Sequence, residues 1–243
     1  MLEKINNKDV LFLDIETVSE YPAHSEMPER LHDLWAKKTK YIQEKEDITP
    51  EELYERAGIY SEFGKIVCIS VGFMVEQEKT WHFRLKSFYG DNEKELLGNF
   101  NNLLNNSFNK EQHYLCGHNS KEFDFPYIAR RSLINGLKLP KQLNIAGKKP
   151  WEVKHLDTMD LWKFGDYKHY TSLNLLTAIF DIPTPKDDID GSEVGRVYWV
   201  EKNLDRIAEY CQKDVLAVAQ LFLRYKGEDL ILPENIKIVG YSD

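Results

Sequence analysis

Hydrophobic residues along the chain fall into runs that predict strands. Residues 10–18 and 65–75 are almost continuously apolar, which is typical of strands that are buried on both faces. Residues 80–88 alternate apolar and polar side chains, so this strand is expected to keep one face in water. Two shorter apolar segments, at 113–119 and 153–162, are expected to add further strands.

Apolar side chains at helical spacing predict helices between and after these strands. The clearest are residues 92–106 and a final helix at about 203–225, and a polar, helix-prone insertion occupies about 24–60 after the first strand. Within it, Thr49 and Glu52 have the spacing of a capping box. The order of strands and helices predicts a mixed α/β sheet flanked by helices. Further expected elements are helices at 125–136 and 171–180 and a long loop at 181–202.

The composition is that of a globular protein in a reducing compartment. The chain has 243 residues, 42% of them hydrophobic, and we expect residues 1–243 to form a single domain. A net charge of −8 argues against binding nucleic acid through a surface that is basic overall, although bound cations can invert the charge locally. Three separated cysteines, no apolar signal segment and no membrane-length apolar run predict buried free thiols, no membrane span and a soluble, cytoplasmic protein.

Asp14 and Glu16 are two carboxylates inside the apolar run LFLDIETVSE. Residues two apart in a strand point to the same face, so these side chains project together. Like charges this close raise each other's pKa unless a cation lies between them, and carboxylate oxygens are ligands for divalent metals. D-x-E is a common triplet, however. A second copy at 91–93 lies at a predicted helix start, where acids merely favour the helix dipole.

Asp124 lies between two phenylalanines at a strand–helix junction. From the residues alone it is either an acid of the same site or a plain helix N-cap. The neighbouring Asn119, at the end of the preceding strand, is either a site residue or a turn residue.

Tyr210 and Asp214 are four residues apart on the predicted final helix and therefore share a face. Asp214 borders the apolar stripe of this helix without a neighbouring base. An acid pair on the first strand, an acid at a middle junction and this last acid can converge in an α/β domain. Four converging acids are what two-metal phosphoryl chemistry needs.

The segments DIET, NSKEFD and YCQKD resemble, in this order, the three motifs of the DEDD-type 3′–5′ exonucleases. The tyrosine of the third motif marks the DEDDy branch of this DnaQ-like superfamily. FGKIVCISVGF, HLDTMDLW and SLNLLTAIFDIP, between the motifs, resemble the proofreading exonuclease domain of family-B DNA polymerases. The resemblance covers most of residues 8–225 and is strongest to stand-alone PolB-like exonucleases.

The resemblance implies a ribonuclease H-like fold, with a five-stranded mixed sheet flanked by helices and the helical insertion after the first strand. It implies hydrolysis of single-stranded DNA from the 3′ end by a two-metal-ion mechanism, with release of nucleoside 5′-monophosphates. Asp14, Glu16, Asp124 and Asp214 would hold two Mg²⁺ or Mn²⁺ ions. Tyr210 would orient the attacking water.

The resemblance also indicates residues that contact the substrate. Thr17 would border the 3′ nucleotide, and Asn119 would contact that nucleotide or fix the strand end. Lys168 stands where related exonucleases carry a substrate-contacting lysine, with a plain solvated lysine as the alternative. Phe123 would stack on a base or simply pack in the core. Asp157 is expected to be a supporting or structural acid.

Other functions stay open at this point. A 3′–5′ exoribonuclease of the RNase D-like type would carry the same motifs, because only recognition of the ribose 2′-OH separates the two substrates. A nucleic-acid-binding module without catalysis is disfavoured by the intact acids, and a structural domain with accidental acids would leave Asp214 without a partner. The expected partner is therefore nucleic acid, either single-stranded DNA, 3′ ends or RNA; the protein partners stay unknown.

Overall fold

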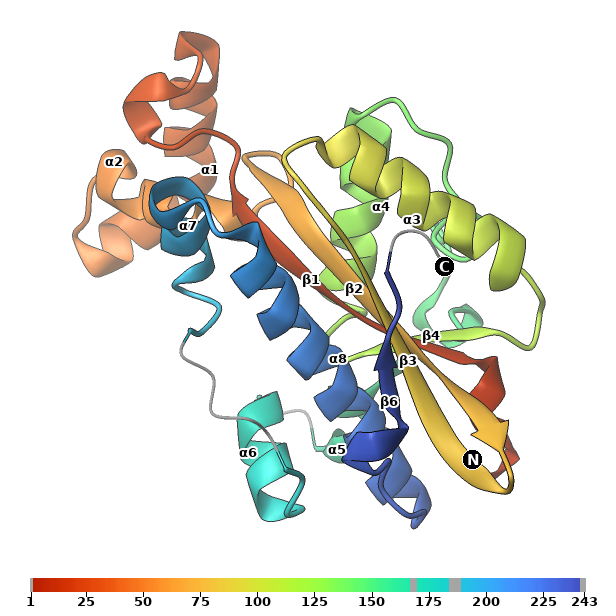
Figure 1. Cartoon of the computed structure of the whole chain (residues 1–243). Coiled ribbons are helices and arrows are strands. Elements are labelled where there is room, and N and C mark those ends of the chain that lie inside the picture. The colour runs from red at the N-terminus through yellow and green to blue at the C-terminus, as the bar shows by residue number, and fades with distance from the viewer. Residues whose placement is uncertain (1, 167–169, 184–188, 241–243) are drawn as a thin grey trace.

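The computed structural model describes residues 2–166, 170–183 and 189–240, and Lys168 lies outside this range. Its centre is a mixed sheet in the order β5-β4-β1-β2-β3-β6 (Figure 1). Strands β1, β2 and β3 are antiparallel neighbours, whereas β4 runs parallel to β1 and to β5. The strands are β1 (Val10–Ser19), β2 (Gly64–Gln77), β3 (Thr80–Tyr89), β4 (Tyr114–Gly117), β5 (Leu156–Asp157) and β6 (Ile236–Ile238).

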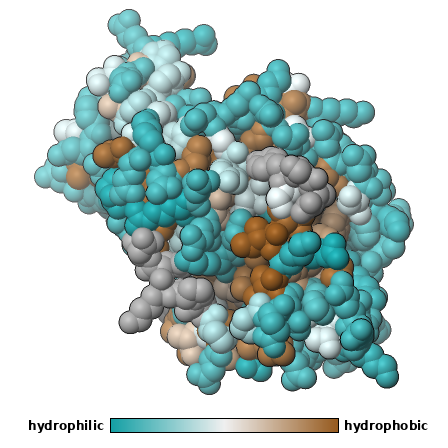
Figure 2. All heavy atoms as spheres, in the orientation of Figure 1, coloured by the Kyte–Doolittle hydropathy of each residue, from teal (hydrophilic) through white to brown (hydrophobic). Residues whose placement is uncertain are grey.

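The predicted mixed α/β sheet flanked by helices is confirmed, but the expected count of five strands is wrong by one among the described residues. The added strand, β6, follows the last helix and pairs in parallel with Phe83–Leu85 of β3. An unpaired strand edge exposes backbone groups, and β6 satisfies part of this edge. Figure 2 shows a hydrophobic area over β6 in a mainly hydrophilic face, and Ile238 is 61% exposed there.

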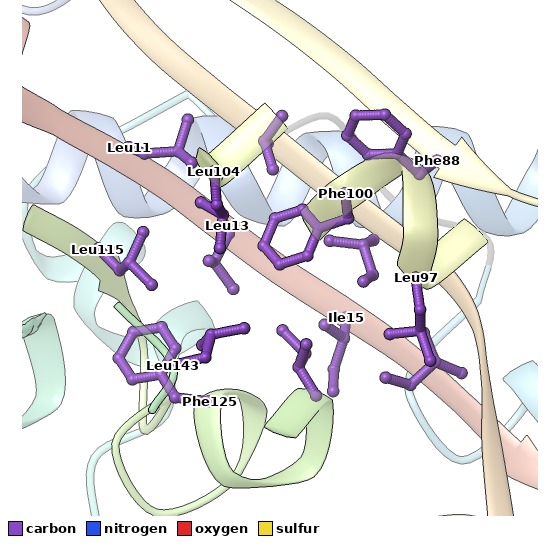
Figure 3. Packing of buried hydrophobic residues seen from close by; sticks show 14 of the residues in the cluster. Leu11, Leu13, Ile15, Phe88, Leu97, Phe100, Leu104, Leu115, Phe125 and Leu143 are labelled. Carbon is purple, nitrogen blue, oxygen red and sulfur yellow. The ribbon is translucent and has the colours of Figure 1, made fainter. Parts of the chain in front are cut away.

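One face of the sheet is covered by α3 (Glu93–Ser107) and α4 (Asp124–Ile134). Alternate side chains of β1 point into this layer, where Leu11, Leu13 and Ile15 pack against residues such as Phe100 and Phe125 (Figure 3). The predicted helix at 92–106 is confirmed, and its apolar stripe forms this side of the core.

The other face is covered by the long helix α8 (Leu204–Lys226). Phe12 of β1 packs with Val215 and Phe222 of this helix. Since side chains alternate along a strand, the residues that share the face of Phe12 are Asp14 and Glu16. The strand therefore turns both carboxylates toward α8, inside an otherwise apolar layer.

The insertion after β1 folds into α1 (Glu29–Glu46), α2 (Pro50–Leu53) and a 3₁₀ helix at Tyr54–Ile59, at the carboxyl end of β1 (Figure 1). The predicted capping box is confirmed, because Thr49 and Glu52 exchange side-chain-to-backbone hydrogen bonds. Trp35 is fully buried and packs edge-on against Tyr54 and Tyr60 of the insertion and against Phe63, which follows it. The insertion thus has a small core of its own.

The prediction of a long loop at 181–202 is wrong for the second half of this segment. Residues Val194–Arg196 form α7 and continue into a π-helical turn at Val197–Glu201. Val194 and Val197 are buried beside Val18, so tertiary packing orders a segment that has no clear periodicity. Among the described residues, the remaining α-helices are α5 (Thr158–Lys163) and α6 (Leu173–Ile179), the second capped by Ser172.

The three cysteines are buried and free, as predicted. None of the helices in the described part of the chain is both long and apolar enough to cross a membrane.

Candidate active site

Asp14 and Glu16 form the floor of a cluster of acids between β1 and α8. Glu16 is only 7% exposed, and none of the described residues hydrogen-bonds or ion-pairs with its carboxylate. One ligand atom each of Asp14, Glu16 and Cys211 lies within 4.8 Å of the other two. A buried carboxylate without a partner is costly. This donor set therefore fits a cation better than it fits a closed structural contact.

Asp124 joins this pair from α4. The helix begins at Asp124 itself, with Phe123 at the N-cap position and without a capping side chain, so the N-cap interpretation is wrong. Its Oδ1 atom instead accepts a hydrogen bond from the backbone N–H of Ile15, at 3.1 Å. Strand β4 pairs with β1 only as far as Phe12. The backbone N–H of Ile15, further along the same edge of β1, binds Asp124 instead. The contact fixes Asp124 to the backbone of Ile15, the residue between the two acids in the chain.

Tyr210 and Asp214 complete the cluster from α8. The phenol of Tyr210 hydrogen-bonds the carboxylate of Asp214, one turn further along the helix. It also lies close enough to Glu16 and Asp14 for their charges to act on it. The structure thus brings all five predicted residues to one point, from β1, α4 and α8.

The electrostatics of the cluster follow from burial and mutual repulsion. Burial, with the nearby charges of Asp124 and Asp214, raises the pKa of Asp14 well above its usual range. Burial and the charges of Asp14 and Asp214 do the same to the pKa of Glu16, and burial raises the pKa of Asp124 to about 7. Each raised pKa means that the charged carboxylate is destabilised, and a bound divalent cation would lower these pKa values again.

Burial and the charge of Asp214 raise the pKa of Tyr210 as well. The phenol therefore stays protonated at neutral pH, as a hydrogen-bond donor and acceptor.

Cys211 belongs to this site, and sequence analysis placed it only in the core. Its thiol lies 3.4 Å from the carbonyl oxygen of Asp14 and 3.5 Å from Oδ2 of the same residue, and donates to both. A cysteine in the apolar stripe of a helix has the pattern of a core residue. Its sequence context therefore does not indicate a contact with Asp14. The available signal was its position three residues before Asp214, on the same helix face.

The second D-x-E triplet has a different role from the one predicted. Glu93 does start α3, but it is buried, and its carboxylate accepts bonds from the guanidinium of Arg131 and from the N–H of Ile66, the latter at 2.7 Å. This pair ties α3 to α4 and to β2. The acid is therefore a structural partner of a buried arginine, which a helix-dipole interpretation misses.

Of the residues predicted to contact substrate, those that the structure describes lie near Glu16 or Asp124 in the chain, and their contacts differ. Thr17 is half-buried beside a β-bulge that follows Glu16. Asn119 has a positive φ of 61°, and its buried Oδ1 has no hydrogen-bond partner among the described residues. Phe123 is half-buried and packs against the core. Asp157 caps α5 and binds the N–H of Asn119, at 2.9 Å, which is a supporting role.

Comparison with known proteins now decides the family. Residues 59–232, more than half of the chain, match the model of a family described as a predicted 3′–5′ exonuclease related to the exonuclease domain of PolB. The chain belongs to this family. The match includes Asn119, Asp124, Tyr210 and Asp214 and begins after Asp14 and Glu16.

A DNA polymerase of Pyrococcus glycovorans is 22% identical to the chain over 142 residues. The aligned part is 53% of this chain and 18% of the polymerase, so the chain spans less than a fifth of that relative. Together with the mixed sheet and its flanking helices, the family places the chain among proteins of ribonuclease H-like fold.

Proposed function

We propose that this protein is a metal-dependent 3′–5′ exonuclease that removes nucleoside 5′-monophosphates from the 3′ end of single-stranded DNA. The observation that carries the proposal is the convergence of Asp14, Glu16, Asp124, Tyr210 and Asp214 in one partly buried cluster. These residues come from three separate elements, and burial plus repulsion makes the cluster costly without a cation. Membership of the exonuclease family supports the same reaction.

In this proposal, Asp14, Glu16, Asp124 and Asp214 hold two Mg²⁺ or Mn²⁺ ions. Such ions, when bound, offset the carboxylate charges and stabilise the negative charge that develops on the phosphate oxygens. Carboxylate oxygens are the ligands that both cations prefer. The acids therefore supply a fixed frame, and the surrounding apolar layer of β1 and α8 holds it in place.

Tyr210 is proposed to orient the attacking water. Its phenol donates one hydrogen bond to Asp214, and its oxygen keeps lone pairs that accept from a water molecule. The raised pKa suits a group that holds a water and does not remove its proton. Asn119 is proposed to receive the terminal nucleotide, since its unpartnered Oδ1 is an acceptor available to a sugar hydroxyl. Thr17 and Phe123 would border that nucleotide.

The proposal is tested with single-stranded DNA and RNA of one sequence, each labelled at the 5′ end. With Mn²⁺ or Mg²⁺, we expect a ladder of labelled DNA fragments that shorten from the 3′ end, and no reaction in EDTA. Early release of the labelled terminal mononucleotide would show the opposite polarity and overturn the proposal. Degradation of RNA alone would instead identify an exoribonuclease.

A further inference from the structure

The segment between α4 and β5 carries an unusual concentration of positive charge. Between positions 138 and 154 the chain has five lysines and a single acid, in a protein whose net charge is −8. All five lysines are exposed. The five lysines are Lys138, Lys141, Lys148, Lys149 and Lys154. We call these lysines, together with Lys110 and Trp151, the basic surface.

The lysines of the basic surface have almost no acidic partners. Lys141 lies 3.8 Å from Glu111 at an exposed position, where an ion pair contributes little. In the described parts of the chain, no carboxylate lies within ion-pairing distance of the other four lysines. Clustered charges of one sign repel each other, and they attract a ligand of opposite sign. This arrangement therefore favours a polyanionic partner.

An aromatic side chain lies among these charges. Trp151 is 77% exposed, and the Nζ atom of Lys149 lies 5.1 Å from the centre of its ring. A groove of about 230 Å³ runs beside the segment, and Lys110, Lys148 and Lys154 line part of it. Surfaces that bind single-stranded nucleic acid combine lysines for the phosphates with aromatic rings on which bases stack. An acidic polypeptide would pair with the lysines but has no bases to stack on the indole ring of Trp151.

The chain leads from the basic surface through His155 into β5. The ring of His155 lies 4.9 Å from that of Phe125, the residue after Asp124. The chain then enters β5, whose Asp157 binds the N–H groups of Asn119 and Lys121. Lys154 is three positions before Asp157, so the segment ends close to the residue that positions Asn119.

We propose that the basic surface binds the phosphate backbone of the nucleic acid upstream of its 3′ end. This inference rests on the proposed function, and it assigns to the enzyme a preference for substrates long enough to span both regions. Lysine contacts to phosphates carry no sequence information, so the preference concerns length and not sequence. Trp151 adds stacking, which tolerates any base.

The test uses the full-length protein and a variant that combines Lys148→Glu, Lys149→Glu and Lys154→Glu. A matched control makes the same charge change on the insertion, with Lys37→Glu, Lys40→Glu and Lys45→Glu, which are exposed residues of α1. The first measurement is the ratio of kcat/KM for single-stranded DNA of about 30 nucleotides to kcat/KM for a tetranucleotide. The second is the affinity for the long strand in EDTA, from fluorescence anisotropy over a range of salt concentrations.

We expect the kcat/KM ratio to fall about tenfold or more in the first variant and to keep its wild-type value in the control. The slope of log affinity against log salt should become shallower by about one for each lost phosphate contact. Trp151→Ala should weaken binding about tenfold. Unchanged ratio, affinity and slope in the first variant would overturn the inference while leaving the exonuclease proposal intact.

Two further outcomes separate the proposals. If the protein hydrolyses neither substrate, but the basic-surface variant alone loses DNA binding, the proposed function and the length preference fail, and only nucleic-acid binding by the basic surface is supported. If poly-L-glutamate of equal charge displaces DNA fully at equal concentration and Trp151→Ala has no effect, the surface fits an acidic polypeptide and the inference is overturned.

Discussion

The sharpest prediction concerns Asp124→Asn in the metal-free protein, where we expect the variant to be more stable than the wild type above neutral pH. Burial raises the pKa of Asp124 from an ordinary 3.8 to about 7. A carboxyl group with a raised pKa binds more protons in the folded state than in the unfolded state. The free energy of unfolding therefore falls as the pH rises between these two values, and the loss is complete above about pH 7.

The size of this loss in unfolding free energy follows from the difference between the two pKa values of Asp124. At about 1.4 kcal/mol for each pH unit, the wild type loses about 4 kcal/mol across this window through Asp124 alone. Asparagine keeps the Oδ1 acceptor for the N–H of Ile15 and removes the charge. The gain from Asp124→Asn should therefore be close to zero near pH 4 and grow toward about 4 kcal/mol near pH 8.

The assay is urea unfolding in EDTA at several pH values, followed by circular dichroism. Asp33→Asn, at an exposed position of α1, is the matched control and should change nothing. Added Mn²⁺ should reverse the order of stability, because the proposed function has this ion bind the folded wild type, and a ligand that binds the folded state stabilises it. An equal effect at low and high pH, or a loss of stability at high pH, would refute the electrostatic account of the cluster.

Three further predictions concern other parts of the molecule. Tyr210→Phe should lower kcat about a hundredfold by releasing the water, with unchanged Mn²⁺ affinity in calorimetry; a collapse of that affinity would contradict the role. Glu93→Gln should lower the free energy of unfolding in urea by about 3 kcal/mol, because Arg131 then keeps Glu20 alone as an ionised partner among the described residues. A loss below about 1 kcal/mol would show that Glu20 suffices. Trp35→Ala should cost about 3–5 kcal/mol by emptying the core of the insertion, and unaltered resistance to proteolysis would argue against it.

The acids of the cluster were predictable to different extents, and the reasons are physical. The period of two along a strand places Asp14 and Glu16 on one face wherever the strand lies in the sheet. Tyr210 and Asp214 likewise share a face through the local geometry of a helix. These two relations are local, so the sequence alone predicts them.

Long-range contacts account for what was missed. Asp124 looks the same in sequence whether it caps a helix or binds Ile15, because the contact joins residues 109 positions apart. The contact of Cys211 with Asp14 and the pairing of Glu93 with Arg131 are likewise created only by the packing of separate elements. Strand β6 has three residues, too few for a periodic pattern.

The most direct test of the central claim compares the wild type with Asp14→Asn in the release of nucleotide from a 3′-labelled DNA strand with Mn²⁺. If the buried acids hold the cations that stabilise the reacting phosphate, the variant should retain its fold and lose at least about a hundredfold in rate, since several kcal/mol of charge stabilisation disappears. A folded Asp14→Asn protein that releases the labelled nucleotide at the wild-type rate would contradict the claim.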